Sequence, residues 1–237
     1  MAIAFDAATG SEAATGTLTV SHTATGTNLL AIVKVNSGNV TDSITDVTYD
    51  GASIFGNLIA KVVVPANSYE YLFYYNAPPT GAKDVVATNS VPGYTIMAVA
   101  TYTGCDQTSA VIDSFNTGSV TAGTALSIST TVVGSNCWLV AGQRNNGGVA
   151  FTGDTGTTVR IQEPSGGGSF DSNGTVSTGS QPQGTTWSGS YNCAGVVASI
   201  LPASTTAIKT FNGLANASTK TVNSLARASV KTWNGLA

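Results

Sequence analysis

The stretch Ser68-Tyr-Glu-Tyr-Leu-Phe-Tyr-Tyr-Asn76 decides the fold class, because an aromatic residue occupies every second position from Tyr69 to Tyr75. In an extended strand successive side chains point to opposite faces, so these four rings share one face and the side chains between them share the other. Aromatic residues favour strands, where they pack against neighbours across the sheet. We therefore predict a β-strand whose aromatic face is used for packing; stacking of the tyrosines on sugar rings is the less favoured alternative.

Short runs of the same kind recur along most of the chain, between turn residues such as Asp50-Gly51 and Pro78-Pro79-Thr80-Gly81. Before residue 204 no stretch has a helical period with caps. Many short strands at this spacing predict an all-β fold, an antiparallel β-sandwich of the jelly-roll kind, over residues 1–203. Residues 164–192, rich in glycine, serine and threonine, are expected to form a long loop or an irregular hairpin. Strands are expected at Thr17–His22, Asn28–Asn36, Ser43–Tyr49, Leu58–Val64, Tyr69–Asn76, Asp84–Thr88, Thr95–Thr103, Leu126–Val133, Cys137–Arg144, Thr157–Gln162 and Gly195–Leu201.

The composition excludes several classes of protein. Charged residues make up 9% of the 237 residues, against about 25% in an average protein. No apolar run is long enough to span a bilayer, and the many β-branched and aromatic residues argue against disorder. The first sixteen residues lack the basic and apolar regions of a secretory signal. We expect a β-rich protein with a neutral hydroxyl and amide surface, outside any membrane.

The C-terminal segment, residues 204–237, repeats with a period of eleven residues, in units that begin at Ile208, Thr219 and Val230. Such internal repetition is typical of regular, stacked structure. Three short units bury too little surface to stand alone, so the segment is expected to dock on another surface and mediate assembly. The apolar residues expected to make that contact are Ile208, Phe211, Leu214, Val222, Leu225, Val230, Trp233 and Leu236.

Two conformations of this tail are compatible with the repeat. Its apolar positions step by three, four and four residues, which is the rhythm of a helix with a slight right-handed supercoil. Asn-Gly at residues 212–213 and 234–235 argues against the helix, because glycine destabilises a helix interior by roughly 1 kcal/mol. Asn-Gly between apolar residues is also the strongest short hairpin signal. Tight β-hairpins are favoured, with the helix as the alternative.

Charge is divided unevenly between the two segments. The tail carries Lys209, Lys220, Arg227 and Lys231 and no acidic residue, for a net charge of +4. The preceding residues carry the other five basic and all twelve acidic residues, for a net charge of −7. Opposite net charges guide association, so the tail of one molecule is expected to lie on the acidic body of another.

Catalytic chemistry is not indicated. The single histidine, His22, cannot form a histidine-rich metal site, and no Gly-x-Ser-x-Gly elbow accompanies it. Asp154 lies in one Thr-Gly-Asp-Thr-Gly sequence, whereas aspartic-protease chemistry needs two such carboxylates, so a turn is favoured. Cys137 and Cys193 either pair or, as we favour, stay buried thiols. No cofactor, metal or nucleic acid is expected to bind.

Three further stretches carry a family resemblance. They are Val47-Thr-Tyr-Asp-Gly-Ala-Ser53, Tyr71-Leu-Phe-Tyr-Tyr-Asn-Ala-Pro-Pro-Thr-Gly81 and Ala98-Val-Ala-Thr-Tyr-Thr-Gly-Cys-Asp-Gln-Thr108. Together they resemble jelly-roll-like β-sandwich proteins of phage and bacterial genomes, although Asp50 and Cys105 depart from that pattern. The tail resembles the I-K-x-h-N-G-h-A repeats at the ends of phage-associated proteins. The resemblance implies a structural part of a virion or surface assembly and brings no catalytic residues.

Two functions follow as hypotheses. The first is a non-enzymatic structural subunit of a phage virion or extracellular filament, such as a capsid, decoration or fibre protein, whose partners are copies of itself and other virion proteins. The second is a glycan-binding surface module, for which Trp187 and Trp138 are the candidate contacts. A hydrolase is the weakest option, because no acid–base pair is evident.

Overall fold

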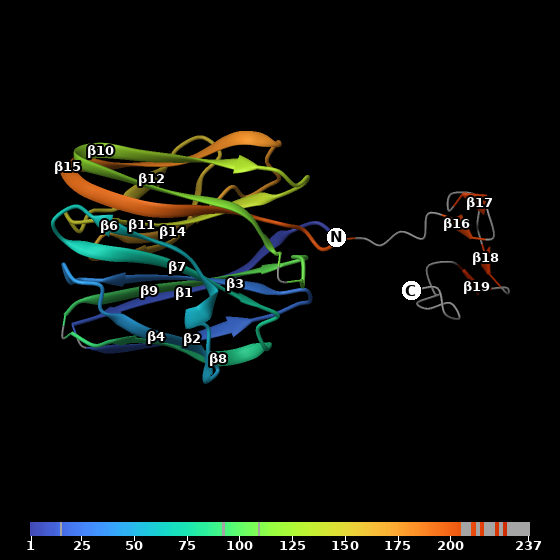
Figure 1. Ribbon diagram of the computed structural model, residues 1–237, viewed down its shortest axis with the longest axis horizontal. Coiled ribbons are helices and arrows are strands. Elements are labelled where there is room, and N and C mark those ends of the chain that lie inside the picture. The colour runs from blue at the N-terminus through green and yellow to red at the C-terminus, as the bar shows by residue number, and fades with distance from the viewer. Residues whose placement is uncertain are drawn as a thin grey trace. The chain divides into compact units, whose positions relative to one another are not determined.

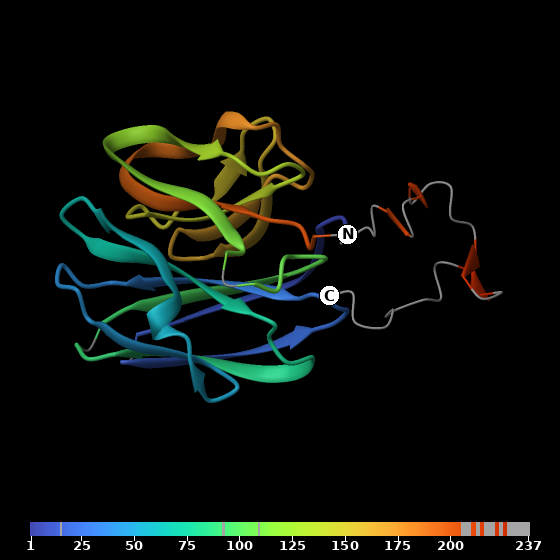
Figure 2. The same cartoon turned by 45° about the vertical axis from the view of Figure 1, so that its right-hand side comes forward.

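The computed structural model describes residues 1–14, 16–91, 93–108 and 110–204, together with the backbone of eight residues of the tail. The chain divides into two compact units, Met1–Ala203 and Ser204–Ala237. The first unit, called the body below, consists of antiparallel sheets that stack as three layers (Figures 1 and 2). The predicted all-β sandwich is confirmed, and it has one layer more than the two of a simple sandwich.

The central sheet has the strand order β1-β9-β3-β7-β6. Its strands are β1 (Ala4–Ala13), β9 (Thr95–Thr103), β3 (Leu30–Ser37), β7 (Ser68–Asn76) and β6 (Leu58–Val64). One outer sheet, which we call the small sheet, has the order β2-β8-β4-β5. Its strands are β2 (Thr17–Ala24), β8 (Gly81–Asn89), β4 (Ile44–Tyr49) and β5 (Ala52–Ser53), and a short 3-10 turn, η1 (Phe55–Asn57), leads into β6.

The other outer sheet, which we call the curled sheet, has the order β10-β15-β11-β14-β13, and β12 also pairs with β15. Its strands are β10 (Ile112–Val132), β11 (Trp138–Asn145), β12 (Phe151–Gly153), β13 (Thr158–Glu163), β14 (Gly167–Asp171) and β15 (Gly179–Ile200). The register between β10 and β15 shifts near Val120 and Gly123, and such bulges bend a strand pair. The bent ribbon folds over β11 and β14 and encloses a core of its own, which includes Leu126, Ile128, Leu139, Phe151, Phe170 and Trp187.

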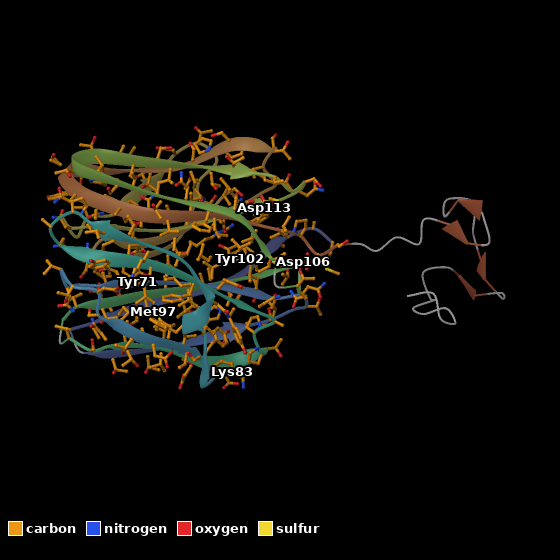
Figure 3. The ribbon with its side chains drawn as sticks, in the orientation of Figure 1. Tyr71, Lys83, Met97, Tyr102, Asp106 and Asp113 are labelled. Carbon is orange, nitrogen blue, oxygen red and sulfur yellow. The ribbon has the colours of Figure 1, made fainter. Side chains whose placement is uncertain are left out.

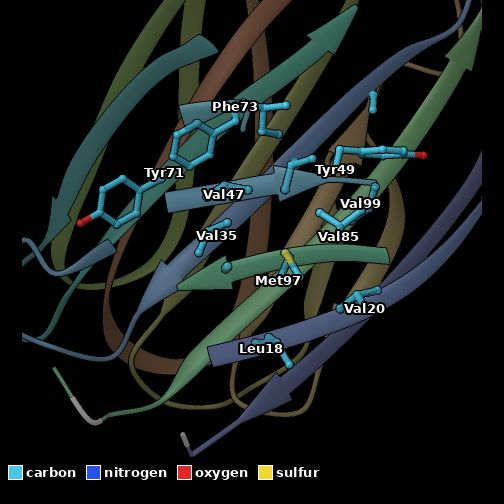
Figure 4. Close-up of a cluster of buried hydrophobic side chains, with 14 of the residues drawn as sticks. Leu18, Val20, Val35, Val47, Tyr49, Tyr71, Phe73, Val85, Met97 and Val99 are labelled. Carbon is cyan, nitrogen blue, oxygen red and sulfur yellow. The ribbon is translucent and has the colours of Figure 1, made fainter. Parts of the chain in front are cut away.

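The central sheet is buried on both faces, which explains the almost unbroken apolar runs of β3 and β9. Alternation along β3 divides its side chains between two cores: Val33 and Val35 face the small sheet, and Leu30 and Ile32 face the curled sheet. Figure 4 shows the first of these cores. The aromatic face of β7 lies in it, with Tyr71 and Phe73 fully buried and their rings stacked at 6.1 Å between centroids. The packing role predicted for this face is therefore confirmed.

Part of the segment 164–192, predicted as a loop or irregular hairpin, forms β14 and the first half of β15 instead. Glycine here packs a strand closely against its neighbours: a Cβ atom on Gly168 would lie 2.4 Å from the ring of Phe170. Strands β1, β5 and β12 and the first half of β10 were also not predicted. Their serine, threonine, glycine and alanine residues carry little of the apolar alternation that identifies a strand.

In the tail, the structure describes two short antiparallel ladders. Thr210–Phe211 pairs with Leu214–Ala215, and Thr221–Val222 pairs with Leu225–Ala226. Pairings of this kind belong to the hairpin alternative, not to the helix. Among the predicted assembly residues, Ile208, Val230, Trp233 and Leu236 lie outside the described residues, and only the backbone is described for the other four. The described part of the chain contains no helix long and apolar enough to cross a membrane.

Candidate functional site

The two tryptophans predicted as glycan contacts are buried, so that prediction needs correction. Trp187 is 6% exposed and Trp138 is 7% exposed. The indole N–H of Trp187 donates to the Gly123 carbonyl at 3.0 Å, and its ring meets Phe151 edge to face. Trp138 packs edge to face on Tyr102 in the core between the central and curled sheets. Neither ring presents a face on which a sugar can stack, because large aromatic side chains at these positions fill cores.

His22 is a fully buried structural residue. It lies on β2, where its two ring nitrogens bond to the Thr9 and Thr101 hydroxyls at 3.1 and 3.0 Å. The Thr101 hydroxyl in turn donates to the Asp6 carboxylate at 2.8 Å. Burial lowers the pKa of His22, and the Asp6 charge opposes that change. Its imidazole is thus satisfied by two threonine hydroxyls inside the body.

Three aspartates, Asp42, Asp50 and Asp154, have separate structural roles. Asp42 accepts hydrogen bonds from Lys61 and Tyr71, whereas Asp50 pairs with Lys83 at 2.9 Å. Asp154 lies in a turn, which the Thr157 N–H closes on its carbonyl at 2.9 Å. Over the described ranges, no three histidine, cysteine or acidic side chains are grouped so that they could hold a metal ion.

The three cysteines, Cys105, Cys137 and Cys193, are buried free thiols. The unpaired alternative for Cys137 and Cys193 therefore holds in this structure. Burial raises the pKa of Cys105 to about 12 and also raises the pKa of Cys193. Thiols that stay protonated are poor nucleophiles, so these cysteines act as small core residues.

An apolar groove of about 430 Å³ lies where the edge strand β6 of the central sheet meets the edge strand β10 of the curled sheet. Phe115 is 54% exposed there and Leu58 36% exposed, which is unusual for large apolar side chains. Asp113, labelled in Figure 3, contributes a carboxylate to the groove and accepts hydrogen bonds from the Val133 and Gly134 amides. The lining residues are Leu58, Ile59, Tyr74, Ile112, Asp113, Ser114 and Phe115.

A second feature, which we call the buried charge cluster, lies between the central and curled sheets and consists of Lys34, Glu70 and Glu163. The Nζ atom of Lys34 on β3 is 3.9 Å from Oε2 of Glu70 on β7 and 3.9 Å from Oε2 of Glu163 on β13. The side chains of Lys34 and Glu70 are fully buried, and that of Glu163 is 2% exposed. In the described part of the chain, no hydrogen-bond partner in good geometry meets the Lys34 ammonium or any of the four carboxylate oxygens.

Two glycines of the curled sheet make room for the cluster. A Cβ atom on Gly142 would lie 2.6 Å from Cγ of Lys34 and 3.0 Å from Oε1 of Glu70. A Cβ atom on Gly167 would lie 2.5 Å from Nζ of Lys34 and 2.7 Å from Oε2 of Glu163. Any larger residue at these two positions would collide with the charged groups. The backbone of β11 and β14 therefore closes directly over the lysine.

Burial dominates the electrostatics of the cluster. It raises the pKa of Glu70 to about 8; the charge of Lys34 opposes this rise and that of Glu163 adds to it. Burial also raises the pKa of Glu163, again against the effect of Lys34. Glu70 is thus a neutral carboxylic acid at pH 7, because a carboxyl group without solvent or strong donors keeps its proton.

Two further charged residues border the cluster. Burial lowers the pKa of the half-buried Arg144, and the charges of Glu70 and Glu12 oppose that change. The Glu12 carboxylate accepts hydrogen bonds from the Tyr94 hydroxyl at 3.1 Å and the Ser165 amide at 3.0 Å. Two basic residues, Lys34 and Arg144, thus lie beside three acidic ones, Glu70, Glu163 and Glu12.

The cluster was not predicted from the sequence. One signal was available: Lys34 interrupts the apolar run Leu30-Ala-Ile-Val-Lys-Val35, and Glu70 interrupts an aromatic stretch. A charged residue inside a buried strand requires a partner, although the sequence does not say which one. No family model, no curated protein and no solved structure matches the chain. The groove and the cluster are therefore interpreted from their own geometry.

Proposed function

We propose that this protein is a non-enzymatic structural subunit that assembles with copies of itself, as part of a phage virion or extracellular filament. Two properties of the same chain carry the proposal. The tail is repetitive, basic and partly apolar, and the body is acidic and exposes an apolar groove at the edges of two sheets. The tail forms a compact unit separate from the body, as a segment used for assembly would.

The proposed partner of the groove is the tail of a neighbouring copy. Two of the three tail units begin with an apolar residue followed by a basic one, Ile208-Lys209 and Val230-Lys231. The groove offers the complementary chemistry, with Phe115 and Leu58 for apolar contact and Asp113 for charge. Burying one large apolar side chain contributes ~1.5–3 kcal/mol, whereas an exposed ion pair contributes less than ~1 kcal/mol. Apolar contact therefore provides most of the affinity, and charge selects the surface.

The glycan-binding alternative loses its main support from the burial of Trp138 and Trp187. Sugar recognition by this body would have to use other side chains, and none of the described aromatic faces favours it specifically. We therefore develop only the assembly proposal.

The test compares the full chain with two single variants that keep the tail intact. Phe115→Ser removes the exposed ring of the groove and is expected to weaken assembly roughly tenfold or more, because one buried apolar side chain is lost from each contact. Val133→Ser is the matched control, since Val133 is 72% exposed and does not line the groove. Analytical ultracentrifugation and electron microscopy measure the assembly.

A shortened chain, residues 1–203, is expected to stay folded and monomeric. Circular dichroism verifies its folding. Normal assembly of this shortened chain would overturn the proposed role of the tail. A full chain that remains monomeric at all concentrations would overturn self-assembly altogether. Equal effects of Phe115→Ser and Val133→Ser would show that the groove is not the contact.

A further inference from the structure

The buried charge cluster is an unfavourable arrangement if it only has a structural role. Removing a lysine and two carboxylates from water carries a large desolvation penalty, which is offset only by excellent geometry and additional hydrogen bonds. Here Nζ of Lys34 lies 3.9 Å from each carboxyl group, beyond hydrogen-bond distance, and these polar atoms make no hydrogen bond of good geometry among the described residues. The same placement is favourable for a reaction, because an amine is held between two carboxyl groups in a dry site.

We propose that Lys34 and Glu70 become joined after folding by an intramolecular amide bond between Nζ of Lys34 and Cδ of Glu70, with Glu163 as the residue that transfers protons. This modification site goes beyond the proposed role in assembly and does not depend on it. The only reactants are side chains of this chain, and the only other product is water.

The reaction balances without a co-reactant. The Glu163 carboxylate first takes a proton from the Lys34 ammonium, which leaves a neutral amine and a neutral acid. The amine nitrogen attacks Cδ of the protonated Glu70 carboxyl, and a tetrahedral intermediate forms. Glu163 then donates its proton to the departing hydroxyl and, as a carboxylate again, accepts the remaining excess proton from nitrogen. The C–O bond breaks as the C–N bond becomes an amide; one water leaves, and Glu163 remains protonated.

The geometry assigns these roles in three ways. First, Asn36 and Glu70 are directly paired between β3 and β7, so Lys34, two residues from Asn36 on the same face, is a diagonal neighbour of Glu70. Second, Lys34 is equally far from the two carboxyl groups, so one can act as the electrophile and the other as the base. Third, Gly142 and Gly167 allow the backbone of the curled sheet to lie against the lysine, where a Cβ atom would collide with the cluster. Holding reactants at this range converts an unfavourable bimolecular step into an intramolecular one.

The protonation states favour the same assignment. Burial keeps Glu70 in the neutral form that an amine can attack, whereas the carbon of a carboxylate anion is a poor electrophile. The reaction also removes one positive and one negative charge from the interior, since both Lys34 and Glu163 end neutral. Loss of these charges relieves the desolvation penalty of the folded, unreacted state, which provides a driving force for bond formation.

The experiment is the intact mass of the purified full chain, measured after reduction and denaturation. The expected mass is lower by one water molecule than the mass calculated from the sequence. After proteolysis, a branched peptide that contains both Lys34 and Glu70 is expected. A full calculated mass would overturn the proposal and leave the cluster as unreacted buried ions. A branched peptide that contains Glu163 in place of Glu70 would overturn the assignment of the electrophile.

Variants test the individual roles. Lys34→Met and Glu70→Met are expected to show the full calculated mass, and Glu163→Gln is expected to react far more slowly while it stays folded by circular dichroism. The matched control is Lys83→Met, which removes the exposed ion pair with Asp50 and should keep the mass deficit. A complete deficit in freshly purified Glu163→Gln would overturn the proton-transfer role of Glu163. Where Glu163→Gln does not fold, Glu163→Asp provides the test, because the shorter side chain keeps the carboxyl group but moves it away from Lys34. Bond formation at the wild-type rate in Glu163→Asp would also overturn the proton-transfer role of Glu163.

Discussion

At the scale of single residues, His22 shows how a buried polar group makes stability depend on pH. Both of its ring nitrogens are used by threonine hydroxyls inside the body, so the neutral ring is satisfied where burial disfavours the charged form. Burial lowers its pKa from the ordinary value of 6.5. Below about pH 6.5 His22 therefore binds more protons in the unfolded chain than in the folded one, so its contribution to stability falls as pH falls.

We predict that His22 lowers the free energy of unfolding below pH 6.5 by up to about 1.4 kcal/mol per pH unit. Urea unfolding at several values between about pH 5.5 and 7 measures the slope, in a range where most carboxylates stay ionised. Unreacted Glu70, whose pKa is raised to about 8, contributes a slope of opposite sign over this range in both proteins. The His22 contribution is therefore the difference in slope between the wild type and His22→Gln, which retains hydrogen-bonding capacity without titration. An identical pH dependence of the two proteins would show that His22 is protonated equally in the folded and unfolded chains.

At the scale of elements, Trp187 holds the curled sheet in its bent form. It lies on β15, its ring packs on Phe151 of β12, and its N–H donates to Gly123, at the irregularity in β10. One side chain thus connects three strands where the long ribbon folds over the rest of its sheet.

Two substitutions at this position separate packing from hydrogen bonding. Trp187→Phe keeps most of the apolar contact but leaves the Gly123 carbonyl without its donor, so a loss of about 1–3 kcal/mol is expected. Trp187→Ala also leaves a cavity, and a loss of about 3–5 kcal/mol is expected. Chemical denaturation measures both. If Trp187→Ala were as stable as the wild type and lost binding on a glycan array, Trp187 would be a glycan contact and not a packing residue.

The same scale shows what the sequence determined about the fold. Alternating or continuous apolar strands, such as β2, β3, β7 and β9, are predictable because burial of their side chains imposes a period of two or an unbroken run. β14 is not predictable in this way, because Gly167 and Gly168 are selected by close backbone packing and leave no apolar pattern. The three-layer arrangement was missed for a related reason: an unbroken apolar run indicates burial on both faces but does not identify the layers that cover it.

At the scale of the whole molecule, the candidate sites depend on contacts between distant segments. Lys34, Glu70 and Glu163 belong to three strands of two sheets, and only the stacking of those sheets brings them together. Likewise the groove needs β6 and β10, which lie at the edges of different sheets. The repeat predicted an assembly role for the tail, but the sequence contained no pattern that marks a surface formed by two remote edges.

Charge at this scale leads to the last prediction, which separates recognition from affinity in assembly. If apolar contact provides most of the binding energy, replacing Lys209, Lys220, Arg227 and Lys231 by glutamine should slow assembly and reduce its sensitivity to salt, with little change in the final extent. Salt screens exposed charges over about 10 Å at 0.1 M, so the wild-type rate should fall with ionic strength while the variant rate stays nearly constant. Light scattering at low and high salt measures the rates. Replacing Lys61 and Lys83 by glutamine is the control, since it makes the body more acidic and should not slow the process. Complete loss of assembly in the tail variant at every ionic strength would mean that ion pairs, not buried apolar surface, hold the copies together.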